Sequence, residues 1–254
     1  MDPRADPQPM RTTTPDIRIV EDHEQLSVVA ADVIAEVIAT DPRAAIAVAT
    51  GETPMGAYAE LARRRAAGSL DTSLLRPFQL DDYVGIDVDD PRSLLGWTLR
   101  SFAGPLGIPR DRVVAIPTEG DLAAGCAAYD RAVAEAGGFA LAILGIGSNG
   151  HVAFNEPPSD TDAPTREVAL SVETVAANAR YWDGRPVPVS AVTVGMRQLL
   201  AASTALLLAS GPAKRAILRR ALEGPVTPDV PASLLRRGGH LIVIADRAAW
   251  DDGP

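Results

Sequence analysis

The sequence contains very little cysteine, and this excludes two ways of stabilising a chain or binding a metal. Cys126 is the one thiol among 254 residues, and it stands in an alanine-rich stretch. A single thiol cannot form an intrachain disulfide or a cluster of thiolate ligands, so neither a disulfide framework nor a zinc-finger type of site is expected. We expect Cys126 to be a small buried core residue of a cytoplasmic protein.

Long apolar runs and an excess of positive charge are also missing. No stretch approaches the roughly 20 apolar residues of a membrane-spanning helix, and nothing resembles a signal peptide. The formal net charge is −9, and no basic run offsets it, so binding to a phosphate backbone is not expected. The sequence therefore predicts no nucleic-acid partner and no membrane partner, and a small molecule is the expected ligand.

What the sequence does contain is an alternation of short apolar runs with longer helical patterns. The expected strands span residues 17–20, 45–49, 77–80, 113–116, 140–144, 191–194, 205–209 and 241–245. The expected helices span residues 22–39, 55–67, 121–136 and 212–222. Such alternation predicts an α/β fold, with an open, mostly parallel, Rossmann-like sheet that has helices on both faces. Ligands of such sheets bind beyond the carboxyl ends of the strands, so the residues just after each strand are the candidates for chemistry.

Two segments depart from this alternation. Residues 1–15 carry four prolines among charged and polar residues, which predicts a disordered tail. Residues 16–254 are expected to form one catalytic domain. Within it, the segment from about 158 to 190 is rich in Pro, Asp, Thr and Arg and has weak periodicity. Long irregular segments in compact domains are often lids, and we expect a lid here.

A glycine motif follows the expected strand 140–144. Gly145, Gly147 and Gly150 match the spacing of a dinucleotide-binding turn, but that turn must open a helix that receives the pyrophosphate. Pro157 and Pro158 leave no room for such a helix. The dinucleotide interpretation therefore fails on its structural context.

The same segment concentrates polar chemistry after a strand. His151, one of three histidines, is preceded by Asn149 and followed five residues later by Glu156. A carboxylate can orient an imidazole through its second nitrogen, as in a catalytic dyad. The alternative is a surface histidine in a tight loop, and the residue types alone do not decide between the two.

Two further clusters follow strands. The loop 50–54 places Gly51, Glu52 and Thr53 before a helix, where backbone N–H groups and the helix dipole favour an anion. Its alternative is an ordinary helix start. Asp81 and Asp82 follow the next strand, and either could be a base for a proton next to a carbonyl, or both could simply form a turn.

Two cationic side chains are candidates for binding an anion. Lys214 stands in the first turn of the expected helix 212–222, and Arg180 lies inside the expected lid. A lysine in a first helical turn opposes the helix dipole unless an anion is bound there. Exposed surface charge is the alternative for both. No metal-binding set is evident, because histidines are few and the acids lack ligand spacing. Together the residues indicate a site for a small phosphorylated molecule.

These motifs resemble those of the glucosamine-6-phosphate deaminases. The run 144–157, LGIGSNGHVAFNEP, resembles that family's signature almost throughout. Four shorter runs are also similar to parts of that family. The run 80–85 (LDDYVG) is similar to its base segment, 49–54 (ATGETP) to its phosphate loop, and 177–180 (ANAR) and 211–214 (GPAK) to its two basic contacts. The similarity extends from about residue 17 to residue 245. The FNEP ending separates this chain from the related 6-phosphogluconolactonases.

The resemblance implies an enzyme of amino sugar metabolism and N-acetylglucosamine catabolism, an isomerase-deaminase that needs no cofactor and no metal. Glucosamine 6-phosphate and water would give fructose 6-phosphate and ammonium, a reaction that places the enzyme among the hydrolases. His151, oriented by Glu156 and Asn149, would open the sugar ring. Asp81 would then move a proton from C2 to C1. The phosphate would be held by the remaining candidates: Gly51, Glu52, Thr53, Arg180 and Lys214.

Three departures from the family pattern carry expectations. Asn149 stands where some members have aspartate, which would affect the basicity of His151. Glu52 replaces a small residue of the phosphate loop, which bears on phosphate affinity. In members activated by N-acetylglucosamine 6-phosphate, a basic residue lies two positions after the arginine that matches Arg166. Val168 stands there, so weak or absent activation is expected.

Other functions remain open at this stage. One alternative is a lactonase-type hydrolase on the same fold, against which Glu156 and Asp81 argue. Another is a non-catalytic sugar-phosphate sensor, which loss of Asp81 or His151 would have favoured. Galactosamine 6-phosphate is an alternative substrate, because lid and loop geometry determine which sugar is accepted. A homo-oligomer is also left open.

Overall fold

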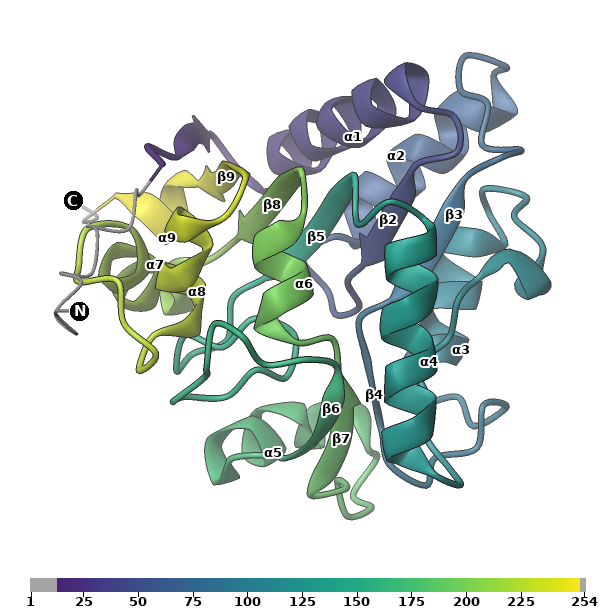
Figure 1. Ribbon diagram of the computed structural model, residues 1–254. Helices are drawn as coiled ribbons and strands as arrows, with labels where there is room; N and C mark the ends of the chain where they lie inside the picture. Colours follow the sequence, from purple (N-terminus) through teal and green to yellow (C-terminus); the bar gives the residue numbers. More distant parts are fainter. Residues whose placement is uncertain (1–12, 252–254) are drawn as a thin grey trace, which may run out of the picture.

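The larger of two β-sheets forms the frame of the molecule. The structure, a computed structural model, describes residues 13–251. Six parallel strands lie in the order β1-β9-β8-β5-β2-β3 (Figure 1). In that order they are β1 (Asp16–Val20), β9 (His240–Asp246), β8 (Thr204–Ala209), β5 (Leu141–Gly145), β2 (Ala45–Val48) and β3 (Arg76–Gln79). The prediction of an open parallel sheet of the α/β type is confirmed.

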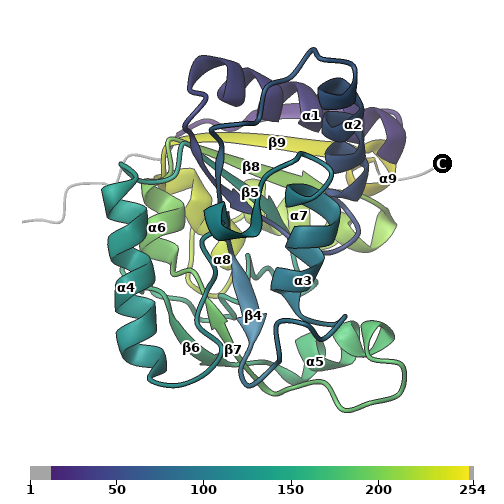
Figure 2. The same cartoon turned by 90° about the vertical axis from the view of Figure 1, so that its right-hand side faces the viewer.

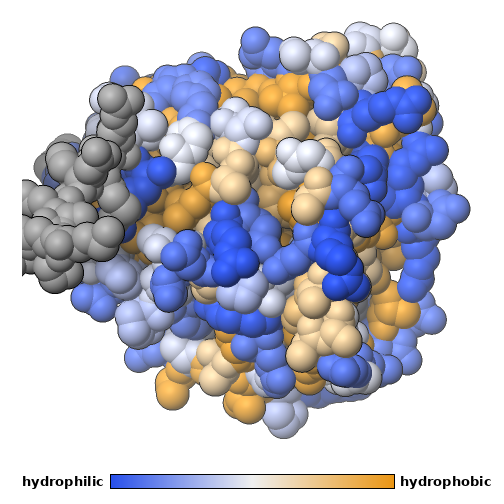
Figure 3. Space-filling view, viewed as in Figure 1, coloured by the Kyte–Doolittle hydropathy of each residue, from blue (hydrophilic) through white to orange (hydrophobic). Residues whose placement is uncertain are grey.

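The strands at the centre of this sheet are buried on both faces. Every residue of Ala45–Val48 and of 141–144 is buried. A strand covered on both faces reads as a continuous apolar run, which is why these segments are visible in the sequence. On the outside, hydrophobic residues form small patches between hydrophilic ones on the face shown in Figure 3.

Helices cover both faces of the larger sheet. The α-helices of residues 13–251 are α1 (His23–Thr40), α2 (Met55–Ala66), α3 (Leu94–Thr98), α4 (Leu122–Glu135), α5 (Val172–Asn178), α6 (Met196–Ala201), α7 (Arg215–Leu222), α8 (Pro231–Leu234) and α9 (Arg247–Trp250); of these, α5 lies beside the smaller sheet described below (Figure 1). α1 and α2 pack together on one side, and α4 and α6 lie on the other (Figures 1 and 2). Asp22 and Asp121 cap α1 and α4 by accepting backbone N–H groups. Within residues 13–251, no helix is both long and apolar enough to cross a bilayer.

A smaller antiparallel sheet lies below the larger one in Figures 1 and 2. Its order is β4-β7-β6, with β4 (Asp81–Tyr83), β7 (Ser190–Thr193) and β6 (Arg166–Ala169). Only Leu80 separates β3 from β4, so the chain passes directly from the carboxyl end of the larger sheet into the smaller one. A second hydrophobic cluster that includes Tyr83, Phe154 and Trp182 accompanies this sheet.

One expected strand is wrong. Residues 113–116 form no strand: Val114 makes a single parallel bridge with Phe78. The backbone N–H of Ile116 then donates to the side-chain oxygen of Gln79, at 3.0 Å. A side-chain acceptor thus takes the place of a neighbouring strand, and the apolar composition of the segment gives no sign of this.

Two other segments differ from expectation. The strand expected at 191–194 forms as β7, but in the smaller antiparallel sheet. The segment 158–190, expected to be irregular, contains both β6 and α5. Ser171 begins α5 by accepting the N–H of Thr174 at 3.1 Å. Most of the predicted tail 1–15 lies outside the described residues.

Candidate active site

Loops from four neighbouring strands meet at one edge of the larger sheet. β8, β5, β2 and β3 are adjacent and parallel, so their carboxyl ends share that edge. The segments that follow them are residues 210–214, 146–156, 49–54 and 80–83. Every predicted site residue except Arg180 lies in these segments, as the search after each strand expected.

The carboxylate of Asp82 is occupied by hydrogen bonds from neighbouring residues. It accepts five hydrogen bonds of 2.8–3.0 Å, from the backbone N–H groups of Tyr83, Leu94 and Leu95, the hydroxyl of Ser93 and the amide of Gln79. Three of these donors belong to the start of α3 or to its cap Ser93, where an acidic group is favoured by the helix dipole. Asp82 therefore holds α3 against the sheet, which is a structural role.

Asp81 has opposite surroundings. It is 7 % exposed, yet no residue in 13–251 makes a hydrogen bond to its carboxylate. Burial raises the pKa of Asp81 to about 8, and the negative charge of Asp82 adds to the rise. A carboxyl group with no protein partner and a pKa near neutrality can take up and release a proton. Asp81, and not Asp82, has the properties of a base.

Asn149, His151 and Glu156 lie together in the loop after β5. His151 Nδ1 is 3.6 Å from Glu156 Oε2, and the amide nitrogen of Asn149 donates to the same oxygen at 2.6 Å. Asn149 also accepts the backbone N–H of His151 at 3.1 Å. The carboxylate thus faces the ring from a position that the asparagine fixes.

The carboxylate of Glu156 is stabilised as an anion. Burial by itself would raise its pKa, but hydrogen bonds from His151, Thr174 and Asn149, together with the charge of His151, lower it to about 2. A carboxylate that stays charged and faces Nδ1 of the imidazole can orient the ring. An oriented imidazole is a suitable group for acid–base chemistry.

Two glycines shape this loop. The His151 ring lies against Gly147, where an added Cβ would be 2.3 Å from its Cε1 atom. Gly150 has φ +94°, a conformation that L side chains rarely adopt. The motif that resembles a nucleotide-binding turn therefore provides room for the histidine ring and the bend that precedes it.

The loop 49–54 offers free donors. Gly51 has φ +92°, and the backbone N–H groups of Gly51, Glu52 and Thr53 have no acceptor within residues 13–251. Unpaired N–H groups before a helix form a natural anion site. The predicted phosphate loop therefore has the geometry that an anion requires.

Lys214 and Arg180 are also brought together. The ammonium of Lys214 donates to the carbonyl of Ile146 at 2.7 Å. Burial lowers the pKa of Lys214, and the positive charge of Arg180 lowers it further. Arg180 in turn lies 3.5 Å from the carboxylate of Glu52. The predicted lid arginine, the lysine before α7 and the loop 49–54 thus lie near one another.

Sequence reasoning missed the contacts that α5 makes with the histidine pair. Thr174 Oγ1 is 3.3 Å from His151 Nδ1, and the backbone N–H of Ser171 points to Glu156 Oε1 at 3.4 Å. The signal that could have revealed them is Ser171 itself, a typical N-cap residue, because a helix here places Thr174 near the ring.

Two more residues support the loop that carries His151. Asn155 is completely buried and donates to the carbonyls of Val152 and Val194. Thr193, which pairs with Asp81 across the smaller sheet, accepts the backbone N–H of Phe154 at 3.1 Å. These contacts connect the loop that carries His151 to the strand pair that carries Asp81.

Comparison with known proteins gives a consistent picture. Residues 21–243 match the family model described as glucosamine-6-phosphate isomerases/6-phosphogluconolactonase. The glucosamine-6-phosphate deaminase of Cutibacterium acnes is 40 % identical over 236 residues, covering 92 % of this chain and 90 % of the relative. Glucosamine-6-phosphate deaminase 2 of Bacillus subtilis is 40 % identical over 239 residues, covering 92 % and 95 %.

Solved structures agree on the fold. A monomeric glucosamine-6-phosphate deaminase superposes with a TM-score of 0.89 at 34 % identity, covering 92 % of this chain and 98 % of that one. The 6-phosphogluconolactonase of Trypanosoma brucei superposes with a TM-score of 0.76 at 21 % identity, covering 94 % and 98 %. At that identity the second similarity shows the shared fold alone.

Proposed function

The chain belongs to the family of glucosamine-6-phosphate isomerases and 6-phosphogluconolactonases, and we propose that it is an isomerase-deaminase within it. It converts glucosamine 6-phosphate and water to fructose 6-phosphate and ammonium. Relatives that share 33–40 % of their residues with it are named glucosamine-6-phosphate deaminase. The lactonase alternative is not favoured, since two solved 6-phosphogluconolactonase structures are only 21 % identical to this chain.

The expected classification as a hydrolase is wrong. The curated relatives are named deaminases, and the family model is named for isomerases. The proposed reaction is an aldose-to-ketose isomerisation coupled to hydrolytic loss of ammonia from C2.

Ring opening is assigned to His151. The O1 hydroxyl loses a proton while the ring oxygen gains one, so a single group that both accepts and donates protons serves this step. Nδ1 of the imidazole faces both the anionic Glu156 and the hydroxyl of Thr174, and Asn149 donates to the carboxylate. We assign Glu156 and Asn149 to the orientation of His151.

Proton transfer between carbons is assigned to Asp81. Its carboxylate removes the proton from C2 of the open-chain sugar, electrons move toward the C1 carbonyl, and the same group returns the proton to C1 by way of an enolamine. The C1 oxygen takes up a proton as the enolamine forms, and return of the proton to C1 leaves an iminium at C2. Water adds to C2, and ammonia leaves as the C2 carbonyl of the ketose forms. A base with a pKa of about 8 both takes this proton and gives it back near neutral pH.

The phosphate is assigned to the other end of the site. The free N–H groups of Gly51, Glu52 and Thr53, the guanidinium of Arg180 and the ammonium of Lys214 would surround it. A held phosphate fixes the sugar relative to Asp81 and His151, which contributes to rate by positioning.

We propose that the segment from about 158 to 190 is the lid of this domain of residues 16–254. Its helix α5 brings Ser171 and Thr174 to the Glu156–His151 pair, and Arg180 reaches Glu52 of the opposite loop. Movement of this segment would therefore change both ends of the site together, and closure would exclude water.

The observation that carries the proposed function is the unpaired, buried Asp81 at the same sheet edge as the His151–Glu156 pair. The test is incubation with glucosamine 6-phosphate while ammonium and fructose 6-phosphate are measured. Galactosamine 6-phosphate and a phosphogluconolactone are run in parallel as the alternative substrates. Absence of ammonium at every pH from about 6 to about 9 would contradict the proposal.

A further inference from the structure

Glu52 places a negative charge where the substrate's phosphate is expected. It lies in the loop before α2, whereas Arg180 lies in the 3-10 turn Ala179–Tyr181. One carboxylate oxygen of Glu52 is 3.5 Å from a terminal nitrogen of Arg180. Within residues 13–251, Arg180 has no other acidic partner.

The Arg180 guanidinium contacts an aromatic neighbour, although 62 % of its side chain is exposed. The same nitrogen donates to the hydroxyl of Tyr181 at 2.6 Å, and the guanidinium lies 4.6 Å from the centre of that ring. Tyr181 packs edge-on against Trp97 at 5.4 Å, and the indole N–H of Trp97 points to the sulfur of Met55 at 3.2 Å. The arginine is thus held over the start of α2 while it faces Glu52.

The charges at this place do not balance without an anion. The positive charge of Arg180 disfavours protonation of the nearby Lys214. The three backbone N–H groups of the loop add to the positive potential. Glu52 supplies one negative charge, which offsets part of this potential. The side chain is 66 % exposed, so solvent weakens the ion pair and the carboxylate can move away.

We infer that Glu52 is a built-in competitor of the substrate's phosphate and sets the specificity of this end of the site. Its carboxylate pairs with Arg180, and an incoming phosphate must take that place. A phosphate dianion attracts Arg180 and Lys214 more strongly than one carboxylate does, whereas a singly charged or uncharged substrate does not. The inference rests on the proposed function, because that function identifies the phosphate as part of the substrate. The pairing of Glu52 with Arg180 is independent of it.

The alternative is that the Glu52–Arg180 pair strengthens binding of the phosphate. If the pair held the lid in its closed position, loss of the Glu52 charge would weaken binding of the phosphate. Competition predicts stronger binding instead, so the sign of the change separates the two.

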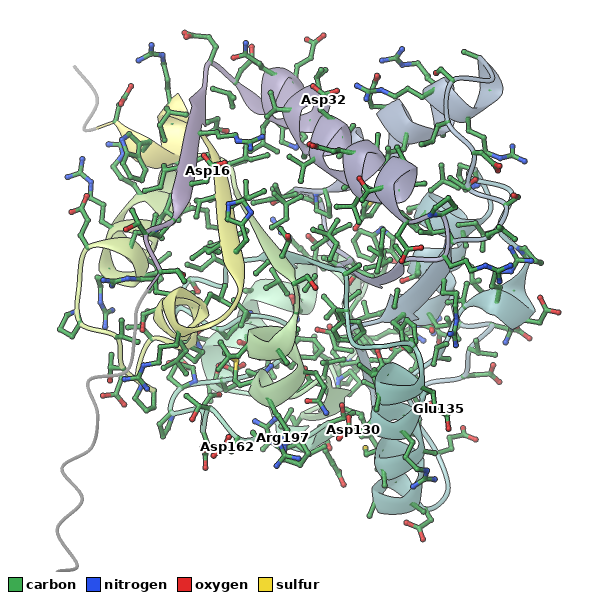
Figure 4. The ribbon with its side chains drawn as sticks, turned by 45° about the horizontal axis from the view of Figure 1, so that its top comes forward. Asp16, Asp32, Asp130, Glu135, Asp162 and Arg197 are labelled. Atoms are coloured by element: carbon green, nitrogen blue, oxygen red, sulfur yellow. The ribbon has the colours of Figure 1, made fainter. Side chains whose placement is uncertain are left out.

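The test compares Glu52→Gln with a matched control, Asp32→Asn. Asp32 lies on the exposed side of α1 (Figure 4) and makes an ion pair with Arg64 at 2.6 Å, so the control also removes one exposed carboxylate from an ion pair with an arginine. Binding of inorganic phosphate is measured by calorimetry, and KM is measured with glucosamine 6-phosphate. We expect E52Q to bind phosphate about three- to tenfold more tightly and to lower KM similarly, while D32N changes either value less than about twofold.

A second background isolates the pair. In an Arg180→Ala protein, Glu52→Gln should change phosphate binding by less than about twofold, because the group for which Glu52 competes is missing. Unchanged or weaker phosphate binding by E52Q, or the same gain in the R180A background, would overturn the inference. Phosphate binding is measured without turnover, so a wild-type protein that fails to release ammonium contradicts the proposed function and leaves this test intact.

Discussion

Asp81 and Asp82 are adjacent in the sequence, and the fold gives their carboxylates opposite tasks. Asp82 accepts five hydrogen bonds that attach α3 to the sheet. The carboxylate of Asp81 accepts none from residues 13–251, and Asp81 is also buried, with 7 % of its surface exposed. The division follows from the strand geometry, because successive side chains of β4 point to opposite faces. One face meets the start of α3, and the other is left for a ligand.

Asp81→Asn should remove the base and leave the fold intact. Asparagine has the same shape, and the carboxylate that it replaces has no protein partner to lose. General base catalysis contributes on the order of 10²–10⁴-fold, so kcat should fall by at least about 100-fold with little change in KM. Steady-state kinetics with glucosamine 6-phosphate measure this. A variant that keeps more than about a tenth of the wild-type rate would show that another group is the base.

Asp82→Asn should show the reverse pattern. The amide keeps one acceptor oxygen but directs N–H groups at donors such as the N–H of Leu94 or Leu95, which are then left unpaired. A lost hydrogen bond to a charged group costs about 1.5–3 kcal/mol, so we expect the free energy of unfolding to drop by about 2–4 kcal/mol. Urea denaturation of D82N and D81N measures the difference. Equal stability of the two variants would argue against the structural role of Asp82.

The raised pKa of Asp81 predicts a specific pH dependence of stability. Its carboxyl has a pKa of about 8 in the folded protein and 3.8 as its ordinary value, so the folded state holds the proton more tightly. Its contribution to stability is complete below about pH 4 and is lost as the pH rises through 8. Asp81→Asn removes this loss. In denaturation experiments the D81N protein should therefore match wild type only below about pH 4, and its advantage in stability should grow as the pH rises from about 4 to about 8.

The same titration governs activity. Only the deprotonated form of Asp81 accepts the C2 proton, so kcat/KM should rise with pH and level off above about 8. A rate profile from about pH 6 to about pH 9.5 measures this, with thermal unfolding at each pH as the control for stability. A kcat/KM that is flat over this range would contradict the assignment of Asp81.

Glu156→Gln should reduce catalysis through His151. The variant keeps an oxygen for Asn149 but loses the negative charge that stabilises a protonated imidazole. Loss of a carboxylate that orients a catalytic histidine costs up to about 10⁴-fold in kcat, so we expect at least about a 10-fold loss, and His151→Gln should cost at least as much. The loss should appear in kcat with little change in KM, which steady-state kinetics measure. An E156Q variant that keeps the wild-type kcat would mean that Glu156 does not orient His151.

Activation by N-acetylglucosamine 6-phosphate should be weak or absent. Val168 stands where activated members of the family have a basic residue, and the guanidinium of Arg166 is already bound to Asn155 at 2.9 Å. We expect less than about a twofold change in rate at saturating effector, against the 5- to 150-fold range typical of allosteric coupling. Strong activation in a rate assay with and without the effector would refute this.

Much of this fold and site can be predicted because the signals are local. The buried runs of β2 and β5 appear as continuous apolar segments, and the order of strands and helices indicates a parallel sheet. Searching after each strand then selects the loops that contain His151 and Asp81. The failure at 113–116 has the same origin, because the side chain of Gln79, which replaces a strand partner, lies far away in the sequence. The cytoplasmic location stays a prediction.

The sequence by itself determined the fold class, the family and the loops that carry the chemistry, because these depend on residue order and on the spacing of apolar and glycine residues along the chain. Tertiary structure alone decided which of two adjacent aspartates is free, that Thr174 approaches His151, and that Glu52 faces Arg180. Each of these depends on hydrogen bonds or charges between segments distant in the chain. Their energies arise only when the two sheets and α5 are assembled.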